Sequence, residues 1–297
     1  MSRIARHTTA GAKKAAMLGG KEYTCDNGGN MRGNPVKQRL QAGGHAFGTM
    51  IFELFSPGIA RIACNAGAEF ALYDMEHSGF GIGELKAQVA FCRGLDIVPM
   101  VRVPTTQYQF VARALDVGAV GVMVPMVESV EQAREIVGFT RYPPRGRRGA
   151  GFGMAHDDYQ GGNVADKIAA IEARTLVIAQ IETEAGAVAV AVDAIAAVDG
   201  IDVLWLGHFD LTNFMGIPGR FDHPRYLAAV DGIVAAARRH GKAAGFMAAD
   251  ETWARDYVAK GFRMLAYGPD QALYQRALGE GIAVLRAAAA GATAKPG

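Results

Sequence analysis

The chain has 297 residues, of which 50% are apolar and 20% are charged, so it is long enough for one large barrel or two small domains with a sizeable core. The formal net charge is +2, from 31 basic and 29 acidic residues mixed along the chain, and no basic stripe with interleaved aromatic residues indicates nucleic acid as a partner. No apolar run approaches the roughly 20 residues of a membrane span, and the first residues lack an apolar signal core. We therefore expect a cytoplasmic protein that binds neither nucleic acid nor membrane.

The composition divides the chain into three parts. Residues 1–33 hold clustered Lys, Gly, Asn and Thr without a steady period, which predicts an irregular or flexible N-terminal arm. Regular apolar patterns fill residues 34–290, which we expect to form one catalytic domain, and residues 291–297 are expected to form a loose tail.

Short apolar runs alternate with helical spacing between these ends. The eight runs that we predict to be strands are Ala46–Phe52, Phe70–Tyr73, Ile97–Arg102, Ala119–Val124, Leu176–Ile181, Val203–Leu206, Ala243–Met247 and Arg263–Tyr267. The stretches predicted to be helices are Gly83–Arg93, Gln107–Val117, Ser129–Thr140, Ala185–Val198, Arg225–His240, Glu251–Lys260 and Asp270–Ala289. Ser129 and Asp250 stand where helix N-caps are expected.

This alternation predicts an α/β fold, and eight strands in about 250 residues favour a closed, parallel (β/α)₈ barrel, or TIM barrel, over an open sheet. No glycine-rich phosphate loop follows a strand, since GGHAFG at 43–48 precedes its strand, so nucleotide binding is not indicated. In such a barrel the chemistry lies at the carboxyl ends of the strands.

Polar residues directly follow several of the predicted strands. Asp74, Glu76 and His77 follow the second strand, Arg102 ends the third, Glu182 follows the fifth and Asp210 lies just past the sixth. We expect these side chains to meet at one rim of the barrel, because each comes directly after an apolar run.

Glu182 and Asp210 come from neighbouring strands and can share a divalent cation. Carboxylate oxygens favour magnesium or manganese over zinc, and two protein ligands leave positions for water and substrate. Alternatively, the two acids cap the helices that follow them.

Arg102 and His77 are the other candidate catalytic residues. Arg102 can present its planar fork to a carboxylate or enolate oxygen, or it can form an internal ion pair at the barrel mouth. His77, with Asp74 and Glu76 beside it, suits proton transfer near neutral pH. No lysine ends a predicted strand, which excludes a Schiff-base aldolase and leaves carbanion chemistry to a metal.

Six sequence blocks together carry a family resemblance. They are DMEH at 74–77, RVP at 102–104, GVMVPMVES at 121–129, RYPPRGRRG at 141–149, QIETEAG at 180–186 and GHFDLTNFMGIPG at 207–219. In this order and spacing the chain resembles the HpcH/HpaI family of class II, metal-dependent pyruvate aldolases. The resemblance implies a homohexamer, built as a trimer of dimers, in which the last helix is exchanged between subunits. It also implies a divalent metal cofactor, Mg²⁺ or Mn²⁺, with Co²⁺ as a further option.

Carried over by position, the resemblance makes Glu182 and Asp210 the metal ligands and places Arg102 at the substrate keto oxygen. It makes His77 the acid–base residue. Asp116, in RALDVGA, is similar to the family acid that supports this histidine across a subunit contact.

Gln180 and the backbone around Gly207 and Phe209 match positions that hold water, metal or the substrate carboxylate. His208 and Phe209 depart from the small residues that are common in better-known members, which predicts a different pocket wall and a smaller or aromatic acceptor. His208 is expected either to touch substrate or to pack locally.

Three arginines crowd the glycine-containing loop at 141–149. Arg145, Arg147 and Arg148 can grip a distal carboxylate of a dicarboxylic substrate or stabilise a subunit contact. The structural role is favoured for Arg145 and Arg147, whereas Arg148 is kept as a candidate substrate ligand because it fits the family block.

The expected reaction is reversible cleavage of a 4-hydroxy-2-oxo acid into pyruvate and an aldehyde through a metal-stabilised enolate. His77, oriented by Asp116 or Asp74, is expected to remove the proton of the 4-hydroxyl. Two alternatives stay open: an oxaloacetate decarboxylase or CoA-thioester lyase that uses the same enolate, and a non-catalytic barrel that binds small acids.

Overall fold

The computed structural model describes residues 16–18, 21–23 and 31–293. The chain separates into two units, residues 1–30 and 31–297. In the first unit, strands β1 (Ala16–Leu18) and β2 (Lys21–Tyr23) pair antiparallel. The expectation of irregular structure is wrong for these six residues, because two runs so close in the chain can pair locally.

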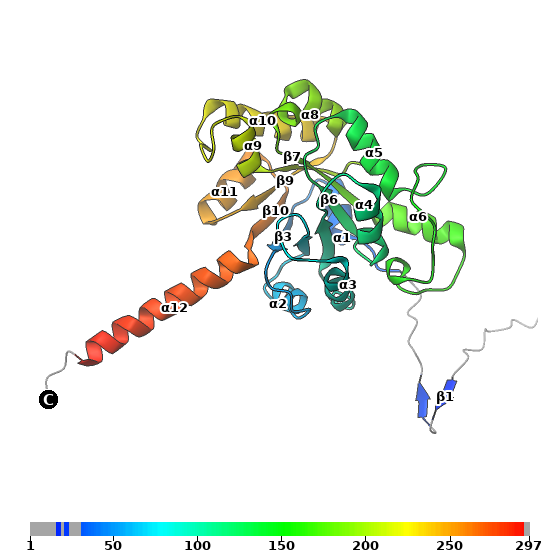
Figure 1. Cartoon of the computed structure of the whole chain (residues 1–297), viewed down its shortest axis with the longest axis horizontal. Coiled ribbons are helices and arrows are strands. Elements are labelled where there is room, and N and C mark those ends of the chain that lie inside the picture. Colours follow the sequence, from blue (N-terminus) through cyan, green and yellow to red (C-terminus); the bar gives the residue numbers. More distant parts are fainter. Residues whose placement is uncertain (1–15, 19–20, 24–30, 294–297) are drawn as a thin grey trace, which may run out of the picture. The chain divides into compact units, whose positions relative to one another are not determined.

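The second unit contains a closed barrel of eight parallel strands, as the alternating pattern predicted (Figure 1). The strands are β3 (Ala46–Ile51), β4 (Phe70–Asp74), β5 (Val98–Arg102), β6 (Gly121–Val124), β7 (Leu176–Ile181), β8 (Val203–Leu206), β9 (Ala243–Ala248) and β10 (Met264–Pro269). They pair in chain order, and β10 closes the barrel onto β3. The (β/α)₈ fold is therefore confirmed, with every predicted strand in place.

Alternate residues of each strand fill two different parts of the core. In β4, Phe70 and Leu72 belong to the cluster inside the barrel, whereas Ala71 and Tyr73 belong to the cluster between strands and helices. Successive side chains of a strand point to opposite faces, and here both faces are buried. This explains why the strands read as continuous apolar runs.

The helices surround the barrel in the order that the sequence predicted, with some differences in detail. They are α1 (Pro35–Gln41), α2 (Ile59–Asn65), α3 (Ile82–Phe91), α4 (Tyr108–Asp116), α5 (Val130–Thr140), α6 (Val164–Arg174), α7 (Glu184–Ala187), α8 (Ala189–Ala196), α9 (His208–Phe214), α10 (Pro224–Arg239), α11 (Glu251–Lys260) and α12 (Asp270–Thr293), with a 3₁₀ turn at Ala155–Asp157. Ser129 and Asp250 cap α5 and α11 as expected, accepting from Gln132 N and Trp253 N.

Two features of the helices correct the sequence-based expectations. The single helix expected over Ala185–Val198 is divided at Val188, whose ψ of 134° interrupts the helical backbone between α7 and α8. Helices α1, α2, α6 and α9 were not predicted. Three of these four have only seven residues, and two turns are too short for a helical period to stand out.

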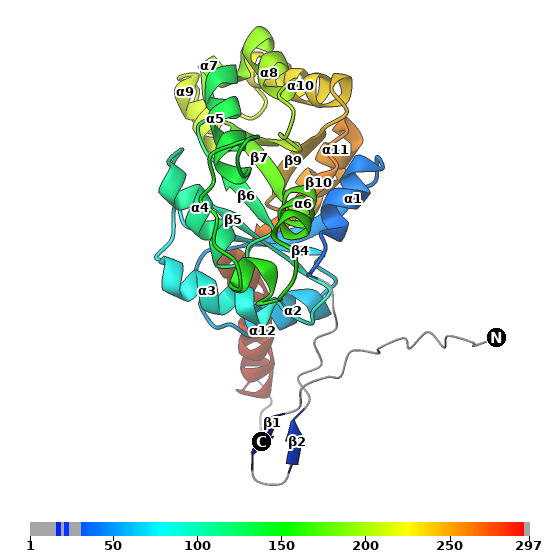
Figure 2. The same cartoon turned by 90° about the vertical axis from the view of Figure 1, so that its right-hand side faces the viewer.

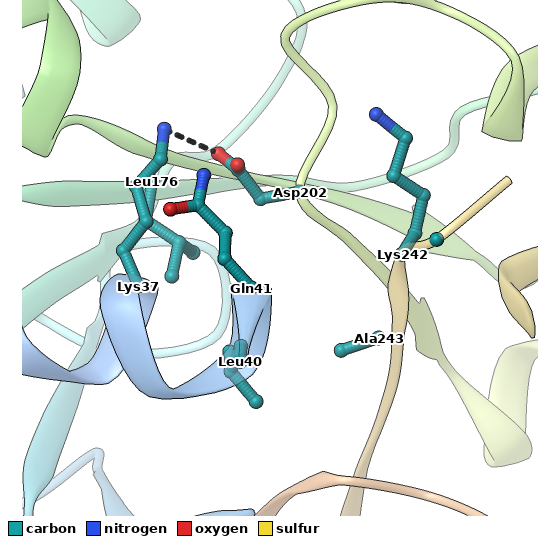
Figure 3. Close-up of a pocket in the computed structure, with 8 residues that line it drawn as sticks. Lys37, Leu40, Gln41, Leu176, Asp202, Lys242 and Ala243 are labelled. Carbon is teal, nitrogen blue, oxygen red and sulfur yellow. Dashed lines mark hydrogen bonds and ion pairs between the residues drawn. The ribbon is translucent and has the colours of Figure 1, made fainter. Parts of the chain in front are cut away.

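Helix α1 covers the end of the barrel where the strands begin. Lys37 Nζ donates to Thr175 O at 2.6 Å and forms an ion pair with Asp202 at 3.1 Å, beside a small cavity of about 100 Å³ (Figure 3). Asn34 bonds the carbonyls of Val120 and Arg174 nearby. Contacts at the amino ends of the strands serve stability rather than chemistry in this fold.

Helix α12 extends away from the barrel (Figures 1 and 2), and every residue from 274 to 291 is exposed. It continues to Thr293, past the position where we expected a loose tail to begin. No helix among the described residues is both long and apolar enough to cross a membrane.

Candidate active site

A cavity of about 450 Å³ opens where the barrel strands end. Eight of the predicted site residues line it: His77, Arg102, Gln180, Glu182, Gly207, His208, Phe209 and Asp210. They come from different strands and the segments that directly follow them. The expectation that the polar strand ends meet at one rim therefore holds for these residues.

Arg102 is anchored by Asp74. The two residues are register partners at the ends of β5 and β4, and Asp74 accepts from Arg102 Nε at 2.7 Å and from Nη2 at 2.8 Å. Burial lowers the pKa of Arg102, but the hydrogen bonds and charge of Asp74, together with Glu76, outweigh it and raise the pKa. The internal ion pair that we considered for Arg102 is thus present, and it holds a charged guanidinium at the cavity wall.

Asp74 also shapes the loop that carries His77. It accepts from the backbone N–H groups of Glu76 at 3.0 Å and His77 at 3.1 Å, and its side chain is fully buried. It therefore fixes the loop backbone, while the acid beside the imidazole is Glu76, whose Oε2 lies 3.6 Å from His77 Nε2.

Glu76 was expected at the rim, but the sequence analysis gave it no catalytic or binding role of its own. Its Oε2 lies 3.2 Å from Arg102 Nε, and its side chain is 11% exposed. Burial raises the pKa of Glu76 to about 7. The charge of Arg102 opposes this rise, and the negative charges of Glu182, Asp74 and Asp210 add to it. Its place two residues after a strand end, next to His77, was the signal that could have given it a role in proton transfer.

Glu182 is held by two donors at the cavity floor. Its Oε1 accepts from Met126 N at 2.8 Å, and its Oε2 accepts from Gln180 Nε2. Met126 has a φ of +55°, an uncommon conformation for a non-glycine residue that concentrates at functional sites. No sequence signal revealed this strained residue, which aims its N–H at Glu182.

The residues around Glu182 fit a bound divalent cation. Burial raises the pKa of Glu182, and the charge of Asp210 raises it further despite the two hydrogen bonds. A cation between the two carboxylates would relieve this repulsion. Gln180 Oε1 is buried without a hydrogen-bond partner, and it offers a third oxygen.

Gly207 keeps the space beside these oxygens open. A Cβ on Gly207 would lie 2.3 Å from Glu182 Oε2 and 3.1 Å from Gln180 Nε2, so only glycine allows the backbone this close. Among the described residues no group of three or more His, Cys, Asp or Glu side chains is placed to hold a metal. Two carboxylates with neutral oxygens suit Mg²⁺ or Mn²⁺, which keep several water ligands.

His208 packs in an aromatic cluster at the cavity wall. Its ring centroid lies 5.1 Å from those of both Phe246 and Trp253. Burial lowers the pKa of His208 to about 4, so the imidazole is neutral at pH 7. The local packing that we considered for His208 is therefore present. His208 also lines the cavity, as does the neighbouring Phe209, which is 58% exposed, so a substrate contact of His208 stays a prediction.

Asp116 and Arg148 lie away from this cavity. They pair with each other, with Arg148 Nη2 at 2.7 Å from Asp116 Oδ1, and Arg148 is 1% exposed. Arg145 pairs with Glu172, and Arg147 lies over the ring of Phe139. None of the three arginines lines the cavity in this chain. Support of His77 by Asp116 requires a second subunit and stays a prediction, as does a substrate contact of Arg148.

The start of α12 also contributes to the site, and the sequence analysis missed it. Asp270 accepts from Phe52 N at 2.9 Å and Leu54 N at 2.7 Å, and from Glu53 N between them. Phe52 and Gln271 line the cavity. We selected polar residues that follow predicted strands. The same rule, applied to the eighth strand, would have selected Asp270 and Gln271.

Comparison with known proteins gives a consistent result. The family model described as HpcH/HpaI aldolase/citrate lyase matches residues 49–277. The chain is 35% identical over 247 residues to a hydroxypyruvate/pyruvate aldolase from Pseudomonas aeruginosa, covering 83% of this chain and 91% of that protein. It is 32% identical over 262 residues to a 2-keto-3-deoxy-L-rhamnonate aldolase from Salmonella dublin, covering 88% and 97%.

A solved structure agrees with these relatives. The crystal structure of an HpcH/HpaI aldolase from Desulfitobacterium hafniense DCB-2 matches with a TM-score of 0.81 and 31% identity, covering 90% of this chain and 99% of that one. The sequence blocks, the barrel and the carboxylates at its strand ends thus agree with the match to the family model. This chain belongs to the HpcH/HpaI aldolase/citrate lyase family.

Proposed function

We propose that this chain is a cytoplasmic, metal-dependent pyruvate aldolase that cleaves 4-hydroxy-2-oxo acids reversibly into pyruvate and an aldehyde. The observation that carries the proposal is the convergence of Glu182, Asp210 and Arg102 on one cavity at the strand ends. The names of the relatives from Pseudomonas aeruginosa and Salmonella dublin, both aldolases, support the same class of reaction.

Glu182 and Asp210 would hold the divalent ion, for which we propose Mg²⁺ or Mn²⁺, with Co²⁺ as a further option. Such an ion supplies positive charge to the keto and carboxylate oxygens of a 2-oxo acid. Gln180 would bind a water molecule or the acid itself through its unpartnered Oε1.

Arg102 stabilises the charge that develops during cleavage. As the C3–C4 bond breaks, its electron pair moves to C3 and onto the keto oxygen of the pyruvate fragment. A guanidinium that Asp74 already holds in place does not need to reorganise at that moment, which makes it effective for the transition state.

His77 performs the proton transfers in this proposal. It lines the cavity with 54% of its side chain exposed, so the 4-hydroxyl of a substrate can reach it. It removes the hydroxyl proton as the aldehyde carbonyl forms, and Glu76 beside Nε2 stabilises the imidazolium that results. The imidazolium then returns this proton to C3, directly or through water, which completes pyruvate and restores the neutral imidazole.

Proton exchange of pyruvate tests the proposal without any aldehyde. In heavy water with Mg²⁺ or Mn²⁺, we expect the methyl signal of pyruvate to disappear from the proton NMR spectrum, and a chelator to stop the loss. A methyl signal that persists with every divalent ion would contradict the proposal. Exchange without an aldehyde product from any 4-hydroxy-2-oxo acid would favour the decarboxylase or CoA-thioester lyase instead.

We also propose that the chain forms a homo-oligomer through α12, in the hexameric arrangement with helix exchange that the family resemblance implied. Tyr274, Leu278, Ile282 and Leu285 are all exposed, and their spacing of four, four and three residues places them on one face of the helix. Such an apolar stripe on a projecting helix suits a second copy of the chain.

Acidic substitutions in this stripe should disrupt the oligomer. We expect the double variant Leu278→Glu and Leu285→Glu to sediment at a smaller mass than the unchanged protein, because buried carboxylates without partners oppose association. The control is Val284→Glu, an exposed apolar residue outside the stripe. An unchanged mass for the double variant, or a monomeric unchanged protein, would refute this arrangement.

A further inference from the structure

A second cavity lies at the opposite end of the barrel, where the strands begin. The start of α1 and the end of α6 line it, and its volume is about 200 Å³. Arg32, Lys37 and Arg174 line this cavity, and none of the described residues around it is acidic. Asp202 pairs with Lys37 at 3.1 Å, so the two arginines set the charge of the cavity. We call it the α1–α6 cavity.

Arg32 brings a guanidinium without a partner to this cavity. Its Nη1 is buried and forms no hydrogen bond among the described residues. The neighbouring carboxylate of Asp158 accepts from the backbone N–H of Arg32 at 2.8 Å instead. An ionised group that loses water without gaining a hydrogen bond is costly. Arg32 therefore needs an acceptor that the described part of the chain does not supply.

The charges around Arg32 do not balance. Asp158 lies 3.1 Å from Arg93 Nε and 3.7 Å from Arg174 Nη1, and its charge also acts on Arg32. Three guanidinium groups thus share one carboxylate, and three minus one leaves two positive charges. Burial lowers the pKa of Arg32 and of Arg174, and the charge of Asp158 does not offset this effect. An excess of positive charge in a partly buried site favours an anion there.

Arg174 is the second candidate ligand in the cavity. Its side chain is 8% exposed, and it donates to Arg32 O at 2.6 Å and to His156 O. A guanidinium has five N–H groups, so these two bonds leave three for another acceptor. The charge of Arg32 lowers the pKa of Arg174 further, which means that the two guanidinium groups repel each other. An anion that contacts both replaces this repulsion with attraction.

We infer that the α1–α6 cavity binds a small divalent oxyanion, such as sulfate or inorganic phosphate, through Arg32 and Arg174. Two negative charges match the excess of positive charge, and guanidinium groups bind oxyanions through paired N–H groups. The cavity is smaller than the roughly 300 Å³ at which pockets for drug-sized ligands begin, which favours an inorganic ion over a nucleotide. The bound anion joins the segment before α1 to the last residue of α6. It therefore stabilises the fold, as contacts at this end of a barrel do.

Thermal unfolding of the whole chain, in metal-free buffer at one protein concentration, tests the inference. We expect about 20 mM sodium sulfate to raise the Tm of the unchanged protein by about 3 °C or more above sodium chloride of equal ionic strength, because the anion binds only the folded state. Arg32→Gln should lose this rise, and calorimetric titration with sulfate should show binding at least about tenfold weaker. Without sulfate, the same variant should melt no lower than the unchanged protein, because it removes an unbalanced charge.

Arg61→Gln is the matched control. Arg61 is exposed on α2 and does not line the cavity, so its variant loses the same charge and should keep the full sulfate effect. Arg32→Lys keeps the charge without the planar fork and should keep part of it. An equal rise in Tm for Arg32→Gln and the unchanged protein would show a general effect of sulfate and overturn the inference. A lower Tm of Arg32→Gln without sulfate would also overturn it, because Arg32 would then already have a stabilising partner.

Discussion

Glu182→Gln should reduce metal-dependent proton exchange of pyruvate about a thousandfold or more. The substitution keeps an oxygen for Met126 N–H but removes one of the two negative charges that would hold the cation. Metal-ion and oxyanion stabilisation contribute several kcal/mol each to reactions of this class. The measurement is loss of the pyruvate methyl signal in heavy water across a titration of Mg²⁺ and Mn²⁺.

Glu184→Gln provides the matched control for this substitution. Glu184 lies two residues further along the same segment, is 53% exposed and pairs with Arg225 instead of facing the cavity. Its variant should exchange pyruvate protons at the normal rate. Equal exchange rates for Glu182→Gln and the unchanged enzyme would remove Glu182 from the metal site.

Arg102→Met should destabilise the fold as well as abolish turnover. Asp74 is fully buried, and its carboxylate would keep two backbone donors but lose the guanidinium that neutralises it. Removal of one partner from a buried ion pair costs about 3–5 kcal/mol of unfolding free energy. Urea unfolding followed by circular dichroism measures this loss, provided that the transition stays two-state.

The double variant Asp74→Asn with Arg102→Met separates stability from catalysis. Without the buried charge, most of the lost stability should return, while aldol cleavage should stay absent because no guanidinium remains beside the keto oxygen to assist the divalent ion. A single Arg102→Met variant with an unchanged urea midpoint would show that Asp74 and Arg102 are not a buried pair. Recovery of activity in the double variant would show that Arg102 has no part in the reaction.

Much of this site was predictable because it follows a local rule. Arg102 and Glu182 come directly at the ends of apolar runs, and the carboxyl ends of parallel strands necessarily share one rim. The same rule, applied to the eighth strand, would have pointed to Asp270 and Gln271. The same rule placed Glu76 at the rim, but we assigned the proton transfer to the neighbouring His77 and gave Glu76 no role of its own.

Other properties of the site could not be predicted from sequence. His208 was open to either substrate contact or packing, and only the structure shows that it packs against Phe246 of β9 and is held neutral by burial. Arg148 belongs to one of the six family sequence blocks, yet in this chain it pairs with Asp116 and does not line the cavity. Nothing in the side chain of Met126 indicates a role at the site. Only the structure shows its positive φ and the hydrogen bond from its N–H to Glu182.

Sequence alone determined which residues form the strands and which polar side chains stand at their ends, because a strand's apolar period and its termination are local properties of the chain. Only the tertiary structure decided which of those side chains touch. Whether Arg102 meets Asp74, or Gln271 lines the same cavity as Glu182, depends on how eight strands close around a shared core. That closure brings together residues far apart in sequence, and their distances, burial and pKa values follow from it.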